Sequence, residues 1–240
     1  MKLDILCIAA HPDDIEMCCG ATIAKEIARG KKVGILDLTR GELGTRGTAE
    51  TRDEESKSAA RILNLAVREN LGFRDGFFIN DEAHQLKVIK MIRKYKPEII
   101  ITNAVSDRHP DHGKGSKLVS DACFLSGLRK IVTFIDESSQ EIWRPKQVLH
   151  TVQWNIHEPD VVVDVTGYMD IKIKSCLAYK TQFYNENDNG SEPDIVISGI
   201  QFIEALKYRS YDLGRIIGVQ YAEGFTVERY VAVDSLFHLI

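Results

Sequence analysis

The chain has 240 residues, 44% of them hydrophobic, so it is long enough to bury a sizeable core and lies within the usual size of one domain. Its formal net charge of −4, with lysines and arginines scattered along the sequence, argues against nucleic acid or an anionic membrane as a partner. The odd number of cysteines, five, argues against a disulfide-stapled secreted protein, and the N-terminal apolar stretch is too short for a signal peptide or a membrane span. We therefore expect a cytoplasmic protein with a single domain over residues 1–240.

Strand and helix patterns alternate along the first half of the chain. Leu3–Ala10 is a continuous apolar run, typical of a buried strand. Ile15, Ile23 and Ile27 then recur at helical spacing until Gly30, where the helix is expected to end. The pattern further predicts a strand at Val33–Leu38, a helix from the cap Thr51 to about Leu63, a strand near Val67–Leu71, a helix around Ile89 and Ile92 that Pro97 stops, and a strand within Glu98–Asn103.

The second half is predicted with the same signals. We expect helices at Lys114–Phe124, Asp170–Lys180 and around Ile200–Tyr208, strands at Val148–Trp154 and Val161–Val165, and a strand-rich segment from Val219 onward. Between them, Asn185–Glu192 is rich in Asn, Asp, Gly and Ser, which is typical of a surface loop. This loop is either a lid over a site or a solvated excursion, and the residues alone leave both open.

The alternation of strand and helix predicts an α/β fold of the Rossmann-like, doubly wound type, with a mostly parallel sheet and helices on both faces. In such a sheet with strand order 3-2-1-4, strands one and four are neighbours. Ligands bind beyond their carboxyl ends, where the order reverses.

Two short polar motifs follow these two strands. His11–Asp14 comes after the first strand and His109–His112 after the fourth, and each offers potential ligands three positions apart. Imidazole and carboxylate together suit zinc or another first-row divalent metal, and three protein ligands with one open position are typical of a catalytic site. The first strand–helix turn carries carboxylates instead of G-x-G-x-x-G, which disfavours a dinucleotide cofactor. The sequence therefore predicts a metal-dependent hydrolase.

The same residues resemble a known family. Ala10–Asp14 and His109–His112 are similar to the two hallmark motifs of the PIG-L/LmbE-like zinc N-deacetylases. Nearly the whole chain takes part, because the likeness extends through Leu38–Thr45, Arg52 with Glu54 and Glu55, Asp107 and Arg108, and Tyr221–Phe225. Within the family the chain looks most like the branch of bacillithiol biosynthesis, which removes acetate from N-acetylglucosaminyl L-malate.

The resemblance implies a role for each motif residue. It places Zn²⁺ on His11, Asp14 and His112, a ligand set that Fe²⁺ also accepts. Asp13 would remain uncoordinated beside the metal as general base. His109 would lie on the opposite side of the substrate amide and protonate the leaving amine, oriented by Asp111. Asp111 also suits a second role as cap of the following helix.

Substrate contacts are expected from charged residues near the motifs. Arg52 and Arg108, helped by Arg46, are candidates for holding an anionic aglycone such as malate, because guanidinium groups match carboxylates bidentately. Arg52 has the alternative of pairing with helix carboxylates such as Glu55. Glu16 is expected either to orient the first helical turn or to contact sugar hydroxyls. In some relatives a loop tyrosine assists the oxyanion, and Tyr184 is the nearest candidate.

The chain departs from the family pattern at Ile15, which stands where an acidic residue is common, and at Cys18 and Cys19, which replace glycines. These departures question the close approach of the first helix and leave the metal ligands intact. The alternatives are deacetylation of another N-acetylglucosamine conjugate, such as a mycothiol precursor, a chito-oligosaccharide or a lipid-linked glucosaminide, and a non-catalytic metal-dependent sugar-binding role. The resemblance also implies a homo-oligomer, with a hexamer among the arrangements of relatives.

Overall fold

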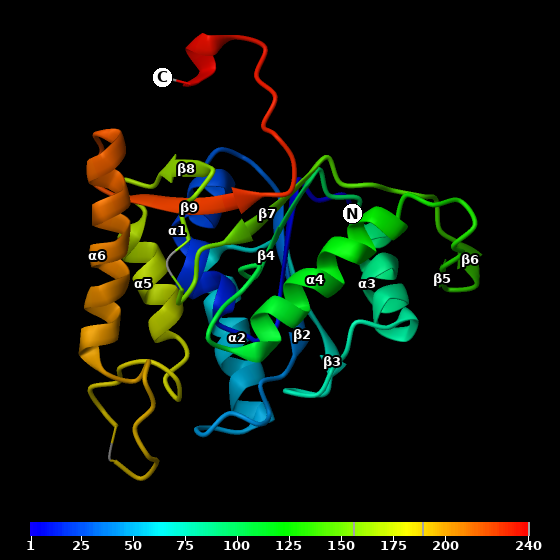
Figure 1. Cartoon of the computed structure of the whole chain (residues 1–240). Helices are drawn as coiled ribbons and strands as arrows, with labels where there is room; N and C mark the ends of the chain where they lie inside the picture. The colour runs from blue at the N-terminus through cyan, green and yellow to red at the C-terminus, as the bar shows by residue number, and fades with distance from the viewer. Residues whose placement is uncertain (156, 189, 240) are drawn as a thin grey trace.

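A seven-stranded sheet runs through the centre of the computed structural model, which describes residues 1–155, 157–188 and 190–239. The strand order is β3-β2-β1-β4-β7-β9-β8, and β1 to β4 and β7 are parallel while β9 runs antiparallel to β7 and β8. Helices cover both faces, α1, α2 and α5 on one and α3 and α4 on the other (Figure 1). The expected Rossmann-like α/β fold and the order 3-2-1-4 are confirmed.

Strands and helices alternate regularly in the first half of the chain and follow an irregular order in the second. The strands are β1 (Ile5–Ala9), β2 (Val33–Thr39), β3 (Val67–Phe73), β4 (Ile99–Thr102), β7 (Gln147–Thr151), β8 (Val161–Asp164) and β9 (Ala222–Val227), with a small separate hairpin of β5 (Phe134–Ile135) and β6 (Ser138–Ser139). The helices are α1 (Asp14–Ala28), α2 (Ala49–Leu63), α3 (Glu82–Tyr95), α4 (Pro110–Leu125), α5 (Met169–Leu177) and α6 (Ile200–Ile217), followed by a 3₁₀ turn at Leu236–Leu239.

Strand β1 is buried on both faces because its successive side chains point alternately into two apolar clusters. Leu6 and Ile8 pack into one apolar cluster under α3 and α4. Ile5, Cys7 and Ala9 pack into another under α1. A continuous apolar run is the sequence that such a doubly covered parallel strand requires. This burial fixes the end of β1, from which the His11–Asp14 motif emerges.

Several predicted boundaries differ from the structure: α6 runs past Tyr208 to Ile217, α5 ends at Leu177, and three further differences have local reasons. Thr51 is not the cap of α2; Thr48 is, and the hydroxyl of Thr51 accepts the Thr48 backbone N–H in return, which completes a capping box. Helix α4 begins at Pro110, earlier than expected, because proline is favoured in the first helical turn. The strand expected to reach Trp154 stops at Thr151, and the following residues turn toward the cavity described below.

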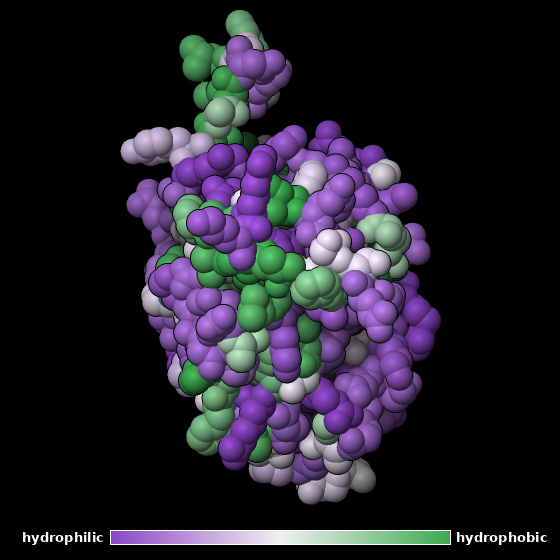
Figure 2. All heavy atoms as spheres, turned by 90° about the vertical axis from the view of Figure 1, so that its right-hand side faces the viewer, coloured by the Kyte–Doolittle hydropathy of each residue, from purple (hydrophilic) through white to green (hydrophobic). Residues whose placement is uncertain are grey.

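The C-terminal segment after β9 projects from the body of the molecule (Figure 1). Its side chains are largely exposed, with Leu236 and Phe237 each at 78% of their full accessibility. Figure 2 shows hydrophobic residues on this projection and a second hydrophobic area on the face formed by α3 and the end of α4. Among the helices of the described residues, none combines the length and hydropathy needed to cross a membrane.

Helix α1 is kinked at Cys19, and a side chain from β9 accepts the backbone N–H groups just after the kink. Cys19 has non-helical torsions (φ −138°, ψ 23°), so the hydrogen-bond ladder is interrupted. The buried carboxylate of Glu223 accepts the backbone N–H of Ala21 (3.3 Å) and of Thr22 (2.7 Å). Lys172 of α5 lies 2.6 Å from the same carboxylate and also donates to the carbonyl of Cys18. Glu223 thus caps the second half of α1.

Replacing Glu223 tests this arrangement. Glu223→Ala leaves two helix N–H groups and a buried ammonium without their acceptor, so we expect a loss of about 3–5 kcal/mol in the free energy of unfolding. Glu223→Gln keeps an acceptor oxygen and should lose less. Urea unfolding followed by circular dichroism measures both, with exposed Glu204→Ala as control, which should shift stability by less than about 0.5 kcal/mol. Equal midpoints for Glu223→Ala and the control would contradict this role.

Candidate functional site

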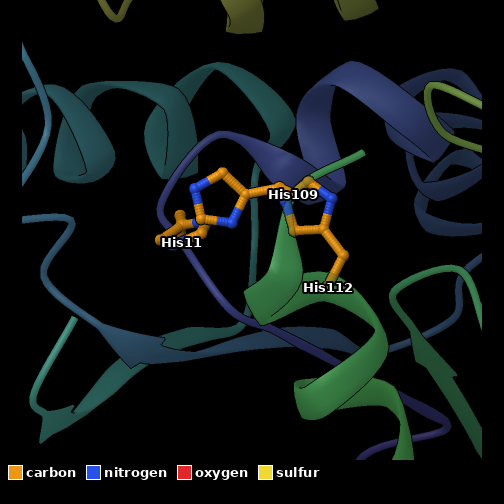
Figure 3. A group of neighbouring side chains, drawn as sticks. All are labelled: His11, His109 and His112. Carbon is orange, nitrogen blue, oxygen red and sulfur yellow. The ribbon is translucent and has the colours of Figure 1, made fainter. Parts of the chain in front are cut away.

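The two histidine–aspartate motifs meet at the carboxyl end of the sheet. Strands β1 and β4 are parallel neighbours, paired from Ile5↔Ile99 to Ile8↔Thr102, so the segments that leave them lie side by side. The ring centroid of His11 lies 4.7 Å from that of His109 and 5.6 Å from that of His112. Figure 3 shows the three rings together, His11 on the turn after β1 and the other two at the start of α4.

Asp14 occupies the centre of this cluster. Its Oδ2 lies 3.5 Å from Nδ1 of His11 and its Oδ1 lies 3.1 Å from Nε2 of His112. The side-chain amides of Asn103 and Gln153 each donate to the carboxylate at 3.0 Å, which fixes its plane. Burial raises the pKa of Asp14, but the two histidines outweigh burial and bring this pKa well below its usual range. The carboxylate is therefore held charged between two imidazole nitrogens.

The outer nitrogen of each imidazole faces a second carboxylate. Nδ1 of His112 lies 2.5 Å from Asp107, and Nε2 of His11 lies 3.0 Å from Asp75. A carboxylate on the outer nitrogen fixes the ring and leaves the inner nitrogen available, which is the usual surrounding of metal-bound histidine. Two imidazoles and one carboxylate, each oriented by neighbours, fit a first-row divalent ion. The three predicted ligands, His11, Asp14 and His112, are thus brought together.

A second candidate donor set shares His11. In the described residues, ligand atoms of His11, Asp75 and Asp111 all lie within 4.8 Å of one another, as do those of the three histidines. Asp111, however, already accepts the Gly76 backbone N–H at 2.8 Å and contacts the Lys114 ammonium at 2.7 Å. This ammonium supplies a positive charge beside the second set, which disfavours a cation there.

Asp13 faces the cavity from a strained backbone position. Its φ is 105°, in the left-handed region that non-glycine residues seldom adopt, and such strain is concentrated at functional sites. The guanidinium of Arg52 lies 2.8 Å from Oδ2 of Asp13 and also donates to the carbonyl of Pro12, which holds this turn in place. Burial raises the pKa of Asp13 to about 7 even though Arg52 opposes the shift.

The contacts of His109 and Asp111 differ from those expected. His109 is the N-cap of α4, and its Nδ1 accepts the backbone N–H of Asp111 at 3.3 Å. The Asp111 carboxylate instead turns to Gly76, Lys114 and, at 3.4 Å, Nε2 of His11. It therefore neither orients the His109 ring nor caps the helix, because the N-cap position belongs to His109. Burial, together with the nearby imidazoles, lowers the pKa of His109.

A cavity of about 550 Å³ opens over the cluster. Asp13, His109, Arg52 and Arg108 line it together with the three proposed ligands. Glu16, Arg46 and Tyr184 do not: the Glu16 carboxylate is fully buried against Arg68 and Tyr179, and Arg46 pairs with Asp188 and Glu192.

Sequence reasoning missed several side chains of this cavity. Gln153 and Trp154 follow β7, Asp75 follows β3, and Arg209 lies in the middle of α6. The signal for three of these four was available, because they stand just beyond the carboxyl ends of parallel strands, where ligands bind. No local signal marked Arg209. The predicted polar loop, Asn185–Glu192, does not line the cavity, but the residues just after it, Asp194–Ile197, do.

Comparisons with known proteins agree with this geometry. A model of the GlcNAc-PI de-N-acetylase family, PIG-L, matches residues 6–123, which include both motifs. A solved structure of a conserved protein from Thermus thermophilus is 35% identical, with a TM-score of 0.86 over 98% of both chains. The chain belongs to the PIG-L/LmbE-like family of deacetylases.

Two curated relatives have different substrates. The diacetylchitobiose deacetylase of Thermococcus kodakarensis is 26% identical over 235 residues, covering 92% of this chain and 81% of that protein. The 1D-myo-inositol 2-acetamido-2-deoxy-alpha-D-glucopyranoside deacetylase 1 of Saccharopolyspora erythraea is 28% identical over 149 residues, covering 45% of this chain and 49% of that protein. The chain thus spans about half the length of this second relative.

Proposed function

We propose that this chain, as one catalytic domain over residues 1–240, removes the N-acetyl group from N-acetylglucosaminyl L-malate, giving acetate and glucosaminyl malate in bacillithiol biosynthesis. The observation that carries this proposal is a pair of cations on the cavity wall. Arg108 and Arg209 both line the cavity. Neither pairs with a carboxylate in the part of the chain that the structure describes, so both are free to bind an anionic aglycone.

Aromatic side chains beside these cations offer a surface for a sugar ring. The guanidinium carbon of Arg108 lies 4.6 Å from the ring centroid of Trp154. Trp154 stacks on Phe202 with an interplanar angle of 11° and a centroid distance of 6.1 Å. Both rings line the cavity, together with Ile195 and Ile197. The cavity therefore combines an apolar wall with placed charges, as pockets for small conjugates do.

His11, Asp14 and His112 would hold the metal, which we propose to be Zn²⁺, with Fe²⁺ compatible with the same donors. When bound, such an ion lowers the pKa of water and polarises an amide carbonyl. Asp13 lines the same cavity and accepts the proton of the attacking water. His109 in its protonated form gives its Nε2 proton to the departing nitrogen as the C–N bond breaks, and the neutral ring that remains accepts the Asp111 backbone N–H on Nδ1. Arg52 keeps Asp13 in position.

A neutral N-acetylglucosamine conjugate is the alternative substrate. The likeness to the chitobiose deacetylase favours a chito-oligosaccharide, and the likeness to the Saccharopolyspora protein favours a mycothiol precursor. Neither aglycone carries a carboxylate, so neither uses the two unpaired guanidinium groups. A non-catalytic sugar-binding role does not explain why Asp13 is held in a strained backbone conformation by Arg52.

We further propose that the chain forms a homo-oligomer through its exposed apolar surfaces. The projecting segment 228–239 exposes Leu236 and Phe237, and Phe124 and Val132 are exposed beside a groove of mixed polar and apolar lining on the face of α3 and the end of α4. Figure 2 shows hydrophobic residues on both the projection and this face. Exposed apolar side chains that gather on one surface are typical of an interaction site.

The substrate assignment is tested with a free-amine assay over N-acetylglucosaminyl L-malate and diacetylchitobiose. We expect Arg108→Ala and Arg209→Ala each to raise KM for the malate conjugate by roughly 10- to 100-fold, because each removes a charge-assisted hydrogen bond of about 1.5–3 kcal/mol. Turnover of diacetylchitobiose should change by much less. Amine release from diacetylchitobiose with none from the malate conjugate would overturn the assignment.

Paired substitutions separate chemistry from metal binding. Asp13→Asn should retain about one divalent ion per chain and lower kcat by roughly 10²- to 10⁴-fold, because only the proton acceptor is lost. Asp14→Ala should lose the ion itself, since this carboxylate joins both imidazoles. Elemental analysis and steady-state kinetics give the two readouts. Full activity of Asp13→Asn, or loss of its metal, would refute the role of Asp13 as base.

Sedimentation velocity tests the assembly. The wild-type protein should sediment as an oligomer at micromolar concentration, and the double variant Leu236→Glu, Phe237→Glu should shift toward monomer because it places charges in an apolar contact. Glu54→Lys on the exposed side of α2 is the control and should leave the oligomer unchanged. A wild-type protein that sediments as a monomer contradicts the proposal.

A further inference from the structure

We propose that Asp75 is a positioning residue that selects the metal-binding nitrogen of His11 and ties the cavity rim, residues 41–45, to the same ring. This inference rests on the metal-dependent chemistry proposed above. Asp75 follows β3, in a segment that carries neither histidine–aspartate motif, yet its side chain is buried and lines the cavity.

The Asp75 carboxylate joins two segments that are distant in sequence. One oxygen, Oδ1, lies 3.0 Å from Nε2 of His11. The other, Oδ2, accepts the backbone N–H of Leu43 at 3.0 Å. The backbone N–H of Asp75 itself donates to Oε1 of Glu42 at 2.8 Å, so the rim and the Asp75 turn are bonded in both directions.

The first bond decides which nitrogen of His11 can bind a metal. An ionised carboxylate only accepts hydrogen bonds, so the Nε2 that faces it carries the hydrogen. In a neutral imidazole the lone pair is then on Nδ1, the nitrogen that lies 3.5 Å from Asp14. In His112 the order is reversed, because Asp107 faces Nδ1 and leaves the lone pair on Nε2, 3.1 Å from Asp14. Asp75 therefore fixes the tautomer of His11, as Asp107 fixes the tautomer of His112.

The second bond holds a rim that has little packing of its own. Gly41, Leu43, Gly44 and Thr45 line the cavity, and the Leu43 side chain is exposed. Within the rim, Gly41 adopts a left-handed φ of 66° and Gly44 donates to its carbonyl, which makes a tight turn. The bond to Asp75 fixes this turn to the metal-binding ring, so rim and ring are placed by one side chain.

Asp75 is better suited to orient His11 than to bind an ion itself. Both of its oxygens are already engaged, one by the ring and one by a backbone N–H. The adjacent Asp111 is paired with the Lys114 ammonium, and this charge opposes a cation in the set formed by His11, Asp75 and Asp111. We therefore expect one ion per chain, which His11, Asp14 and His112 would hold.

Two readouts that need no substrate test the proposal. Metal affinity is measured by competition with a chromophoric chelator, and exchange of the Leu43 amide hydrogen is measured by mass spectrometry. Asp75→Ala should weaken metal binding by roughly 10- to 100-fold and speed exchange of the Leu43 amide, because it removes both bonds. Asp107→Asn, the matched control, should weaken metal binding similarly and leave Leu43 exchange unchanged, since Asp107 contacts His112 and no part of the rim.

Asp75→Asn is the conservative variant in case Asp75→Ala fails to fold. Its amide retains an oxygen for Leu43 but presents a donor to His11, so metal affinity should fall while exchange at Leu43 stays near that of the wild type. Unchanged metal affinity in both variants would overturn the proposal. So would two ions per wild-type chain that fall to one in Asp75→Asn, because Asp75 would then be a ligand. Failure of the malate assay with these metal and exchange effects intact would refute the substrate alone.

Discussion

The parallel pairing of β1 with β4 is the constraint on which the site depends. It places the turn after Ala9 beside the turn after Thr102, and Asn103 then bonds both segments. Its side-chain oxygen accepts the backbone N–H of Ala10 at 2.8 Å while its amide donates to Asp14 at 3.0 Å. The proposed metal-binding carboxylate is therefore oriented by the residue that directly follows β4. A shift in strand register would separate the two motifs and break up the cluster.

The site concentrates charge in a buried region, and the chain offsets each charge with a specific partner. Asp13 is paired with Arg52, and Asp37 and Glu16 share the guanidinium of Arg68 beneath the helix. Ion pairs of this kind contribute little net stability, because the free energy lost on desolvating the charges is about as large as the free energy gained from their attraction. Their value lies in geometry, because the paired cations hold these carboxylates in one arrangement near the cavity. The expectation that Glu16 orients the first helical turn agrees with this placement.

The sequence predicted those site residues that are marked by their neighbours in the chain, and it did not predict those that reach the site through tertiary packing. The two motifs carried their chemistry in four consecutive residues, and the apolar strands before them located the edge of the sheet, so the meeting of the motifs was predictable. The choice of His11, Asp14 and His112 as ligands came from the family resemblance. Arg209 was not predicted, because it reaches the cavity only through tertiary packing, and Asp75 was overlooked although it stands just beyond the carboxyl end of β3. Asp111 was misjudged since its spacing from His109 suits a carboxylate–imidazole pair, whereas the competing Gly76 N–H and Lys114 ammonium draw it away.

The kink in α1 has a consequence for the order in which the protein forms. The helix that begins at the proposed ligand Asp14 is completed by a carboxylate from β9, near the far end of the chain. During synthesis the first turn of this helix leaves the ribosome early, but the acceptor for Ala21 and Thr22 arrives only after nearly all other elements. The proposed metal-binding cluster therefore becomes rigid late, and an incomplete chain holds its first motif on an unfinished helix.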